Sequence, residues 1–278
     1  MNDLFSQFVR WNEGGARVQS GSPDILIKQT SKEERTSFAE VQLLRAEYMM
    51  KAGAVGANDL YQIYLALQRF DVPSEDLHYR VAVFCDGMYS MDTDKVRSDL
   101  VTNILKSYAN VLRYGRSHLF HAMPRMLTIW LDVSQKKTET LETRNKERLS
   151  TPDMDIKDKQ DIDKMNKEMI RAFRQLDSYA FYTAFPQLIS RIVHPNESVF
   201  QTLKIILSEL ICHYPHQCLW QSIAVYRTGH WCKNIRQERC TQVYQVAKNK
   251  DRQIEQLIDQ YDYVSALLIG HVQFCYCI

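Results

Sequence analysis

The feature that most constrains this chain is a helical spacing of apolar residues that recurs along most of its length. The segment "ESVFQTLKIILSELICHY" places Val199, Leu203, Ile206 and Leu210 on one face of a helix. No segment shows the alternation of apolar and polar residues that is typical of strands. With 9 glycines and 7 prolines in 278 residues, the chain also lacks the breakers that many tight turns would need. The sequence therefore predicts an all-α fold.

The predicted helices follow one another after short breaks, which favours antiparallel hairpins stacked into an α-solenoid. No strict repeat period is visible, so we expect degenerate repeats that resemble tetratricopeptide or HEAT hairpins. We predict an irregular N-terminal segment over 1–36, a helical-repeat domain over 37–257 and a divergent tail over 258–278. In the first helix we expect Phe38, Val41, Leu44 and Tyr48 to share one apolar face.

A charged stretch at 134–163 interrupts the apolar pattern. It has few apolar residues and many charges of both signs, which is typical of a solvated connection. We expect this connection to be mobile, with part of it forming an exposed helix.

Charge and cysteine content limit the compartment and the partners. The formal net charge is +2 and the isoelectric point is near 8.1, so nothing in the balance drives the chain toward nucleic acid or an anionic membrane. The seven cysteines cannot all pair, and the N-terminus lacks the pattern of a signal peptide. No apolar run reaches the roughly 20 residues of a membrane helix. We expect an intracellular, reducing compartment with free thiols.

Nucleotide chemistry has no support in the motifs. The sequence contains neither a phosphate-binding P-loop nor a dinucleotide-binding glycine pattern, and its one Gly-Gly pair follows no predicted strand. A protein-kinase catalytic loop is also absent from the sequence. We therefore predict no catalytic residue and no cofactor in this chain.

A group of cysteines and histidines raises the alternative of a zinc site. Zinc ligands usually come as close pairs such as C-x-x-C, and no such pair occurs here. The interpretation as buried thiols and helix-end histidines is favoured, so we predict no metal site, although zinc analysis would test it. The residues in question are Cys212, His213, His216, Cys218, His230, Cys232 and Cys240.

Two further kinds of site are weak candidates. Asp86, Asp132 and Glu209 lie beside apolar runs, but local spacing does not fix any of them near a histidine. The mixture of basic and aromatic residues around Arg116 and His118 could stack nucleobases, yet the balanced charge argues against direct nucleic-acid binding.

The segment "YGRSHLFHAMPRMLTIWLD", residues 114–132, holds histidines and arginines that active sites use, but its spacing indicates packing. An inward face would contain Leu119 or Phe120 together with Met123, Leu127, Trp130 and Leu131. Pro124 is tolerated early in a helix and would otherwise kink it.

Residue roles follow from this packing. We expect Arg116, Arg125 and Asp132 to form ion pairs between helices or to cap them. The predicted core residues are Phe120, Met126, Leu127, Trp130, Leu188, Leu203 and Trp220.

Three blocks in order carry a family resemblance. They are "YGRSHLFHAMPRMLTIWLD", "AFPQLISRIVH" at 184–194 and "YPHQCLWQSIAV" at 214–225. Together they resemble the FAT domain of PIK-related protein kinases, of the ATR branch, over roughly residues 38–257. The resemblance implies an α-solenoid that wraps a kinase domain, takes part in dimerisation and transmits activating signals.

The same resemblance implies a nuclear serine/threonine kinase of the DNA damage and replication checkpoint. Its partners would be its own kinase domain and neighbouring repeats, a second copy, and an ATR-interacting partner protein, with no direct nucleic-acid or membrane contact. ATP and a divalent metal would belong to a kinase domain that follows the FAT domain and is missing here. We expect the chain to be a fragment or a truncated gene product, which transcript sequencing across the 3′ end would test.

Two alternatives stay open. One is a free-standing helical-repeat adaptor protein, which should not co-purify with such a kinase domain. The other is a small zinc-binding helical protein.

Overall fold

A computed structural model describes residues 31–68, 72–91, 98–147, 152–227 and 234–275. All of the regular structure in these ranges is helical. The helices are α3 (Lys32–Lys51), α4 (Ala57–Gln68), α5 (Glu75–Met91), α6 (Ser98–Tyr114), α7 (Leu119–Glu147), α8 (Pro152–Gln175), α9 (Ser178–Tyr182), α10 (Phe185–Ser190), α11 (Glu197–His213), α12 (Pro215–Arg227), α13 (Ile235–Lys250) and α14 (Arg252–Cys275).

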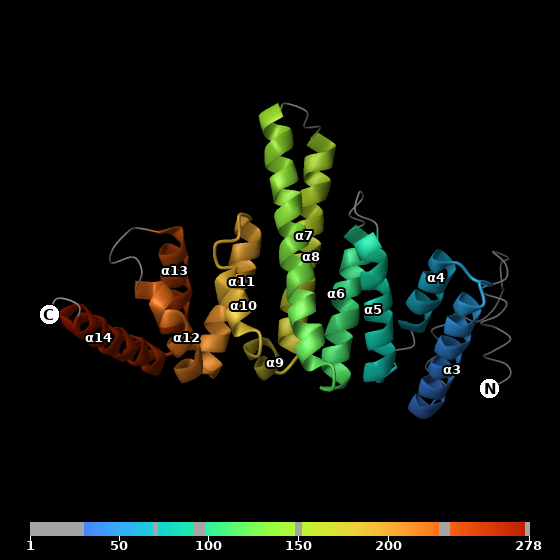
Figure 1. The fold of residues 1–278 in the computed structure, drawn as a ribbon, viewed down its shortest axis with the longest axis horizontal. Helices are drawn as coiled ribbons and strands as arrows, with labels where there is room; N and C mark the ends of the chain where they lie inside the picture. The colour runs from blue at the N-terminus through green and yellow to red at the C-terminus, as the bar shows by residue number, and fades with distance from the viewer. Residues whose placement is uncertain (1–30, 69–71, 92–97, 148–151, 228–233, 276–278) are drawn as a thin grey trace.

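The helices form one extended row in chain order, with α3 at one end and α14 at the other (Figure 1). Most consecutive helices pack on each other, most extensively α5 with α6 and α6 with α7. Several helices also pack on the next but one, such as α6 on α8 and α11 on α13. The two longest central helices, α7 and α8, project from the row as a hairpin (Figure 1). This arrangement confirms the predicted all-α solenoid. Within the described residues, no helix combines the length and the apolar character needed to cross a membrane.

Local signals in the sequence fix several helix ends. The Ser31 hydroxyl accepts a hydrogen bond from the Glu34 amide, and the Glu34 carboxylate accepts one from the Ser31 amide, a reciprocal capping box. Asn196 caps α11 by accepting from the amides of Ser198 and Val199. Gly53 follows α3 with a φ of 71°, a conformation that glycine adopts without strain.

The core runs without interruption from Ala39 in α3 to Ile258 in α14. Its centre is α7, which buries Met123, Trp130 and Leu131 completely. Of the predicted core residues, five lie in this core: Met126, Leu127, Trp130, Leu188 and Leu203.

The prediction that Phe120 and Trp220 belong to the core was wrong. Their exposed fractions are 80% and 72%. Each directly follows a buried leucine, Leu119 or Leu219, and one step along a helix turns a side chain by about 100°. Of the two candidates for the start of the inward face of α7, the leucine is therefore the buried one.

The charged stretch at 134–163 is helical, as was expected for part of it, but it is more buried than a solvated connection would be. Apart from residues 148–151, which lie outside the described ranges, it is built from the last part of α7 and the first part of α8. These parts bury Lys137, Leu141, Asp161 and Ile162, and α7 and α8 pack on each other and on α6. Paired charges therefore hold this region together as a helical hairpin.

The predicted boundaries near the two ends fall inside helices. Helix α3 begins at Lys32, within the segment 1–36 that was predicted to be irregular; residues 1–30 lie outside the described ranges. Helix α14 runs through the predicted boundary at residue 257.

The predicted inward face of α3 was wrong for three of its four residues. Phe38 is buried, whereas Val41, Leu44 and Tyr48 are exposed. The residues that α3 buries instead include Leu43 and the small Ala39 and Ala46, because short side chains allow close approach to the neighbouring helices.

Candidate functional site: the cross-linked centre of the array

A buried carboxylate links three successive helices at the centre of the row. Arg125 of α7 donates from Nε and Nη2 to the two Asp86 oxygens of α5, at 2.7 and 2.6 Å, in a bidentate pair. The Tyr108 hydroxyl of α6 donates to the same carboxylate at 3.0 Å. Burial raises the pKa of Tyr108, and the nearby Asp86 charge raises it further, so the phenol stays a donor at neutral pH.

A second chain of hydrogen bonds links α7, α8 and α11. The Trp130 indole Nε1 donates to Asn166 Oδ1 at 2.9 Å, and Asn166 Nδ2 donates to the Ser198 hydroxyl at 3.1 Å. Trp130 is completely buried and Asn166 nearly so. Because both polar groups have partners, the indole can lie in the core without the cost of an unpaired donor.

The protruding hairpin has its own buried ion pairs. Lys137 of α7 donates to Asp158 at 2.7 Å and to Asp161 at 3.1 Å, both on α8. Asp158 also accepts from Arg144, and Asp161 accepts from the Ser98 hydroxyl of α6. Burial would raise the pKa of Asp161, but the hydrogen bonds from Ser98 and Lys137 outweigh it and lower the pKa below its ordinary value.

The turn between α10 and α11 is fixed by His194 and Arg239. His194 Nε2 lies 3.0 Å from the Leu131 carbonyl oxygen, and its Nδ1 accepts from the Asn196 amide at 3.1 Å, so the ring is neutral in this geometry. Burial lowers the pKa of His194, and the charges of Arg191 and Arg239 lower it further.

Arg239 of α13 reaches the same turn from the other side. Its Nη1 donates to the carbonyl oxygens of Ile192 and His194, at 3.0 and 2.6 Å. Its guanidinium also lies 4.3 Å from the centre of the Phe200 ring.

The arginines and carboxylates singled out from the sequence all form ion pairs between elements. Besides the Asp86 pair with Arg125, Asp132 pairs with Arg191 at 2.8 Å. Arg116 lies 3.4 Å from Asp177 at an exposed position, and Glu209 lies 2.6 Å from Lys250 of α13. These contacts hold neighbouring helices in register, which is a structural role.

The cysteines and histidines considered as zinc ligands do not form a site in the described part of the chain. There, no three metal-ligating side chains converge on a point. His213 and His216 are exposed, with Nδ1 of each near a protein oxygen: the Glu209 carbonyl at 2.8 Å and the Tyr261 hydroxyl at 3.3 Å. His230 and Cys232 lie outside the described residues.

The thiols in this region are buried or half-buried. Cys218 and Cys240 are both fully buried, and burial raises the pKa of each thiol to about 12. Burial also raises the pKa of the half-buried Cys212. A protonated thiol is a poor nucleophile and a poor metal ligand, so these residues act as small core side chains.

Sequence reasoning missed the buried polar residues that connect the helices. Lys137, Asn166, His194 and Arg239 each bond to a group from another helix or turn, at separations of 21 to 63 residues in the chain. Helical periodicity marks which positions are apolar, and a polar residue on the inward face is the only local signal for such a role.

Family models match two separate parts of this array. The FAT domain model matches residues 5–128, and a model described as "Serine/threonine-protein kinase ATR-like, HEAT repeats" matches residues 164–265. Both agree with the helical hairpins seen here.

Curated relatives extend the likeness over most of the chain. The serine/threonine-protein kinase ATR of Caenorhabditis elegans is 32% identical over 88% of this chain, and that of Drosophila melanogaster is 25% identical over 87%. The protein kinase rad3 of Schizosaccharomyces pombe is 27% identical over 71%. The chain spans 9% of the length of each of these three relatives. By its sequence and its fold, the chain belongs to the family formed by the FAT and HEAT-repeat regions of ATR-like serine/threonine-protein kinases.

Proposed function

We propose that this chain is a non-catalytic scaffold segment of an ATR-like kinase that acts in the DNA damage and replication checkpoint. In this role it supports the kinase domain and provides contacts to other proteins in the nucleus. The observation that carries the proposal is the continuous core, cross-linked by buried polar contacts from α5 to α13. These contacts oppose independent movement of the helices, which a scaffold that holds a second domain in place requires.

The acidic residues considered for catalysis are engaged in this framework. Asp86, Asp132 and Glu209 each contact an arginine or lysine from another helix or, for Asp132, from the turn after α10. A carboxylate that acts as a general base must reach a substrate, and these three are instead bonded to side chains of the array. We propose that ATP and the divalent metal bind to a kinase domain outside this chain.

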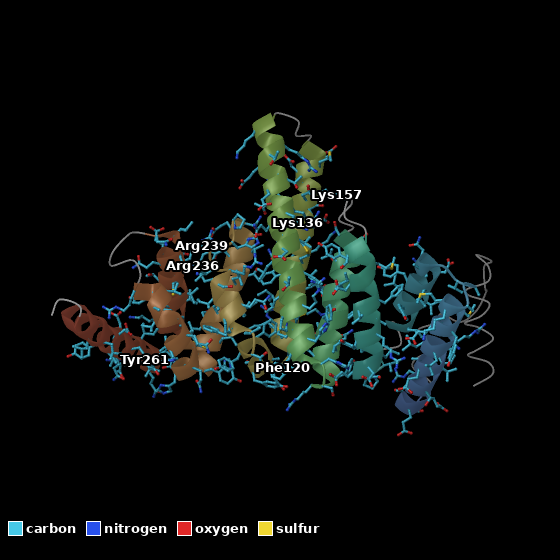
Figure 2. The ribbon with its side chains drawn as sticks, viewed as in Figure 1. Phe120, Lys136, Lys157, Arg236, Arg239 and Tyr261 are labelled. Atoms are coloured by element: carbon cyan, nitrogen blue, oxygen red, sulfur yellow. The ribbon has the colours of Figure 1, made fainter. Side chains whose placement is uncertain are left out.

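Two exposed aromatic residues are the best candidates for contacts of the scaffold. Phe120 at the start of α7 and Trp220 on α12 offer large apolar side chains to solvent, and Phe120 lies at the lower edge of the row in Figure 2. Aromatic residues of this kind often dominate the binding energy of protein interfaces. We assign to these two aromatic residues the partners that the family resemblance implies: the kinase domain, neighbouring repeats, a second copy or an ATR-interacting protein.

Coexpression with an ATR-branch kinase domain tests the proposal. The chain should co-purify with the kinase domain, and the double variant Phe120→Ser/Trp220→Ser should lose most of this binding. Gln217→Ser, at another exposed position of α12, is the matched control and should bind like the wild type. A chain that fails to co-purify, or that binds unrelated helical proteins equally well, would point to the free-standing adaptor.

A phosphate-transfer assay tests the non-catalytic part of the proposal separately. The purified chain alone should transfer no phosphate from ATP to a protein substrate, whereas a mixture with the kinase domain should. Transfer by the chain alone that survives further purification would contradict the proposal.

A further inference from the structure

An open groove of about 520 Å³ lies between α8 and α11, apart from the exposed aromatic residues. Its walls combine one apolar side chain, Ile170, with the neutral polar groups of Asn166, Ser198 and Thr202. Asn166 is nearly buried, accepts a hydrogen bond from the Trp130 indole and donates one to the Ser198 hydroxyl. The floor is therefore preorganised by the core of the array.

A row of cations forms the α8 edge of this groove. Lys167, Arg171 and Arg174 line it and are exposed. Their spacing of four and three residues places them on one face of α8, over about 10 Å of helix axis. Asp163 is the one carboxylate among the lining residues, so the groove carries a local excess of positive charge.

These cations are poorly compensated within the part of the chain that the structure describes. The nearest ion-pair contact of the row is the one between Arg171 and Glu168, a long 3.8 Å pair with the Arg171 side chain 62% exposed. Lys167 and Arg174 have no ion pair there within 4 Å. This contrasts with Arg125, Arg191 and Arg239, whose guanidinium groups each bond to a carboxylate.

We propose that the groove between α8 and α11 docks an acidic segment of a partner protein, with an apolar side chain of that segment seated against Ile170. A row of about 10 Å matches three or four residues of an extended chain, enough for two or three carboxylates. The apolar wall gives such a segment a contact that charge alone would not provide. This inference does not depend on the scaffold function, because it rests on the groove itself.

Nucleic acid fits the same groove less well. Proteins that hold single strands combine a long basic track with aromatic side chains that stack on the bases. The lining residues include no aromatic ring, and the basic row is short. The protruding hairpin beside it also exposes Glu139, Glu142, Asp153 and Asp163, whose charges would repel a longer phosphate backbone.

Fluorescence anisotropy with the full 278-residue chain tests the proposal. The probe is a labelled twelve-residue peptide in which aspartates and glutamates flank one central leucine. The triple variant Lys167→Glu/Arg171→Glu/Arg174→Glu should weaken binding by about tenfold or more at low salt, since three attractions become repulsions. Replacing the peptide leucine by serine should weaken binding by about fivefold through the lost apolar contact.

The protruding hairpin supplies a control with the same change of charge. Lys136, Lys146 and Lys157 are exposed and none of them lines the groove, and Figure 2 shows Lys136 and Lys157 on the upper half of the hairpin. The variant Lys136→Glu/Lys146→Glu/Lys157→Glu should bind the peptide within about twofold of the wild type. Circular dichroism melts of both triple variants establish that they are folded, and the glutamine version of the groove variant replaces the first if it is not.

The alternative occupants give distinct results. Equal losses in the two triple variants, or no binding by the wild type, would overturn the proposal. A twelve-nucleotide single strand that binds more tightly than the peptide and depends on the same three cations would assign the groove to nucleic acid. Self-association that the groove variant abolishes, seen by sedimentation, would assign it to a second copy of the chain. Either of these last two outcomes overturns the proposal.

Discussion

At the scale of single residues, the two tryptophans Trp130 and Trp220 show how position decides what a side chain contributes. Trp130 is completely buried and donates its indole N–H to Asn166, whereas Trp220 is 72% exposed. The same residue type is thus part of the core in α7 and part of the surface in α12. Burial and a satisfied hydrogen bond act together at Trp130, so its replacement should remove both.

We predict that Trp130→Ala lowers the free energy of unfolding by about 3–5 kcal/mol through the cavity it leaves. Trp130→Phe should cost about 1–3 kcal/mol, because it keeps much of the volume but leaves the Asn166 oxygen unpaired. Urea unfolding measures both values. Trp220→Ala is the matched control and should lie within about 0.5 kcal/mol of the wild type. Equal losses at the two tryptophans would contradict the burial assigned to them.

His194 makes stability depend on pH. Its pKa in the folded chain is lowered by burial, whereas in the unfolded chain it takes the ordinary value of about 6.5. The unfolded state then binds the proton more readily than the folded state. The contribution of the neutral His194 to the free energy of unfolding is therefore present above a pH of about 6.5 and is lost as the pH falls below it. The loss continues until the pH reaches the lowered pKa of the folded state.

We predict that His194→Gln flattens the fall in the urea midpoint between about pH 7 and pH 5, the range in which an ordinary histidine is protonated. The glutamine amide can still donate to the Leu131 carbonyl, which limits the general destabilisation. His213→Gln, at an exposed position, should keep the pH dependence of the wild type. If the urea midpoint of His194→Gln falls between about pH 7 and pH 5 as much as that of the wild type, groups other than His194 cause the fall.

At the scale of elements, the α7–α8 hairpin has buried ion pairs between its two helices, where apolar contacts are usual. Lys137 contacts Asp158 and Asp161, and its side chain is 9% exposed. Removing the lysine would leave Asp161 with the Ser98 hydroxyl and a 3.6 Å contact to the exposed Lys164. A buried charge that loses its main partner is costly, whereas the loss of an exposed charge is not.

We predict that Lys137→Met destabilises the hairpin by about 3–5 kcal/mol. Hydrogen exchange should show the loss in residues 134–147 and 152–164 first, since these parts of α7 and α8 share the pair. Lys136→Met, one residue away and exposed, should leave the exchange unchanged. Similar exchange in the two variants would mean that the hairpin is held by its apolar contacts alone.

The same hairpin shows where sequence reasoning reaches its limit. The helical period correctly predicted the helices and the inward positions Met123, Leu127 and Trp130. It failed at the charged stretch 134–163, because composition cannot tell solvated charges from charges that pair across two helices. Lys137 and Asp161 are 24 residues apart, so local spacing gives no sign of their contact.

The site was predictable to a smaller extent than the fold. Spacing indicated ion pairs for Arg116, Arg125 and Asp132, and the structure places each beside an opposite charge. Phe120 was assigned to the wrong side because two adjacent apolar residues offer two alternative faces. Choosing between such faces requires knowing which neighbour covers the helix, and that information is in the tertiary structure.

At the scale of the whole molecule, a row of helices that each contact mainly their neighbours should not be uniformly stable. Helix α7 lies in the middle and is covered by α6 and α8, whereas α14 at one end packs on α12 and α13. Within its described residues α14 buries Ile254 and Ile258, and it leaves Val264, Leu267 and Leu268 exposed. Less buried apolar area means that less free energy opposes local opening.

We therefore predict that native-state hydrogen exchange divides the chain into a stable centre and a labile end. Amides of α14 should exchange through local opening, at a free energy about 2 kcal/mol or more below that of α7, which should exchange through global unfolding. Ile258→Ala should lower protection in α13 and α14 while leaving α5 and α6 unchanged. Ile104→Ala, in the completely buried face of α6, should lower the protection of the central helices. A single exchange free energy for all helices, shifted equally by both substitutions, would instead mean that the array unfolds as one cooperative unit. The cross-helix contacts of Asp86, Asn166 and Arg239, which span α5 to α13, would then contribute to that coupling.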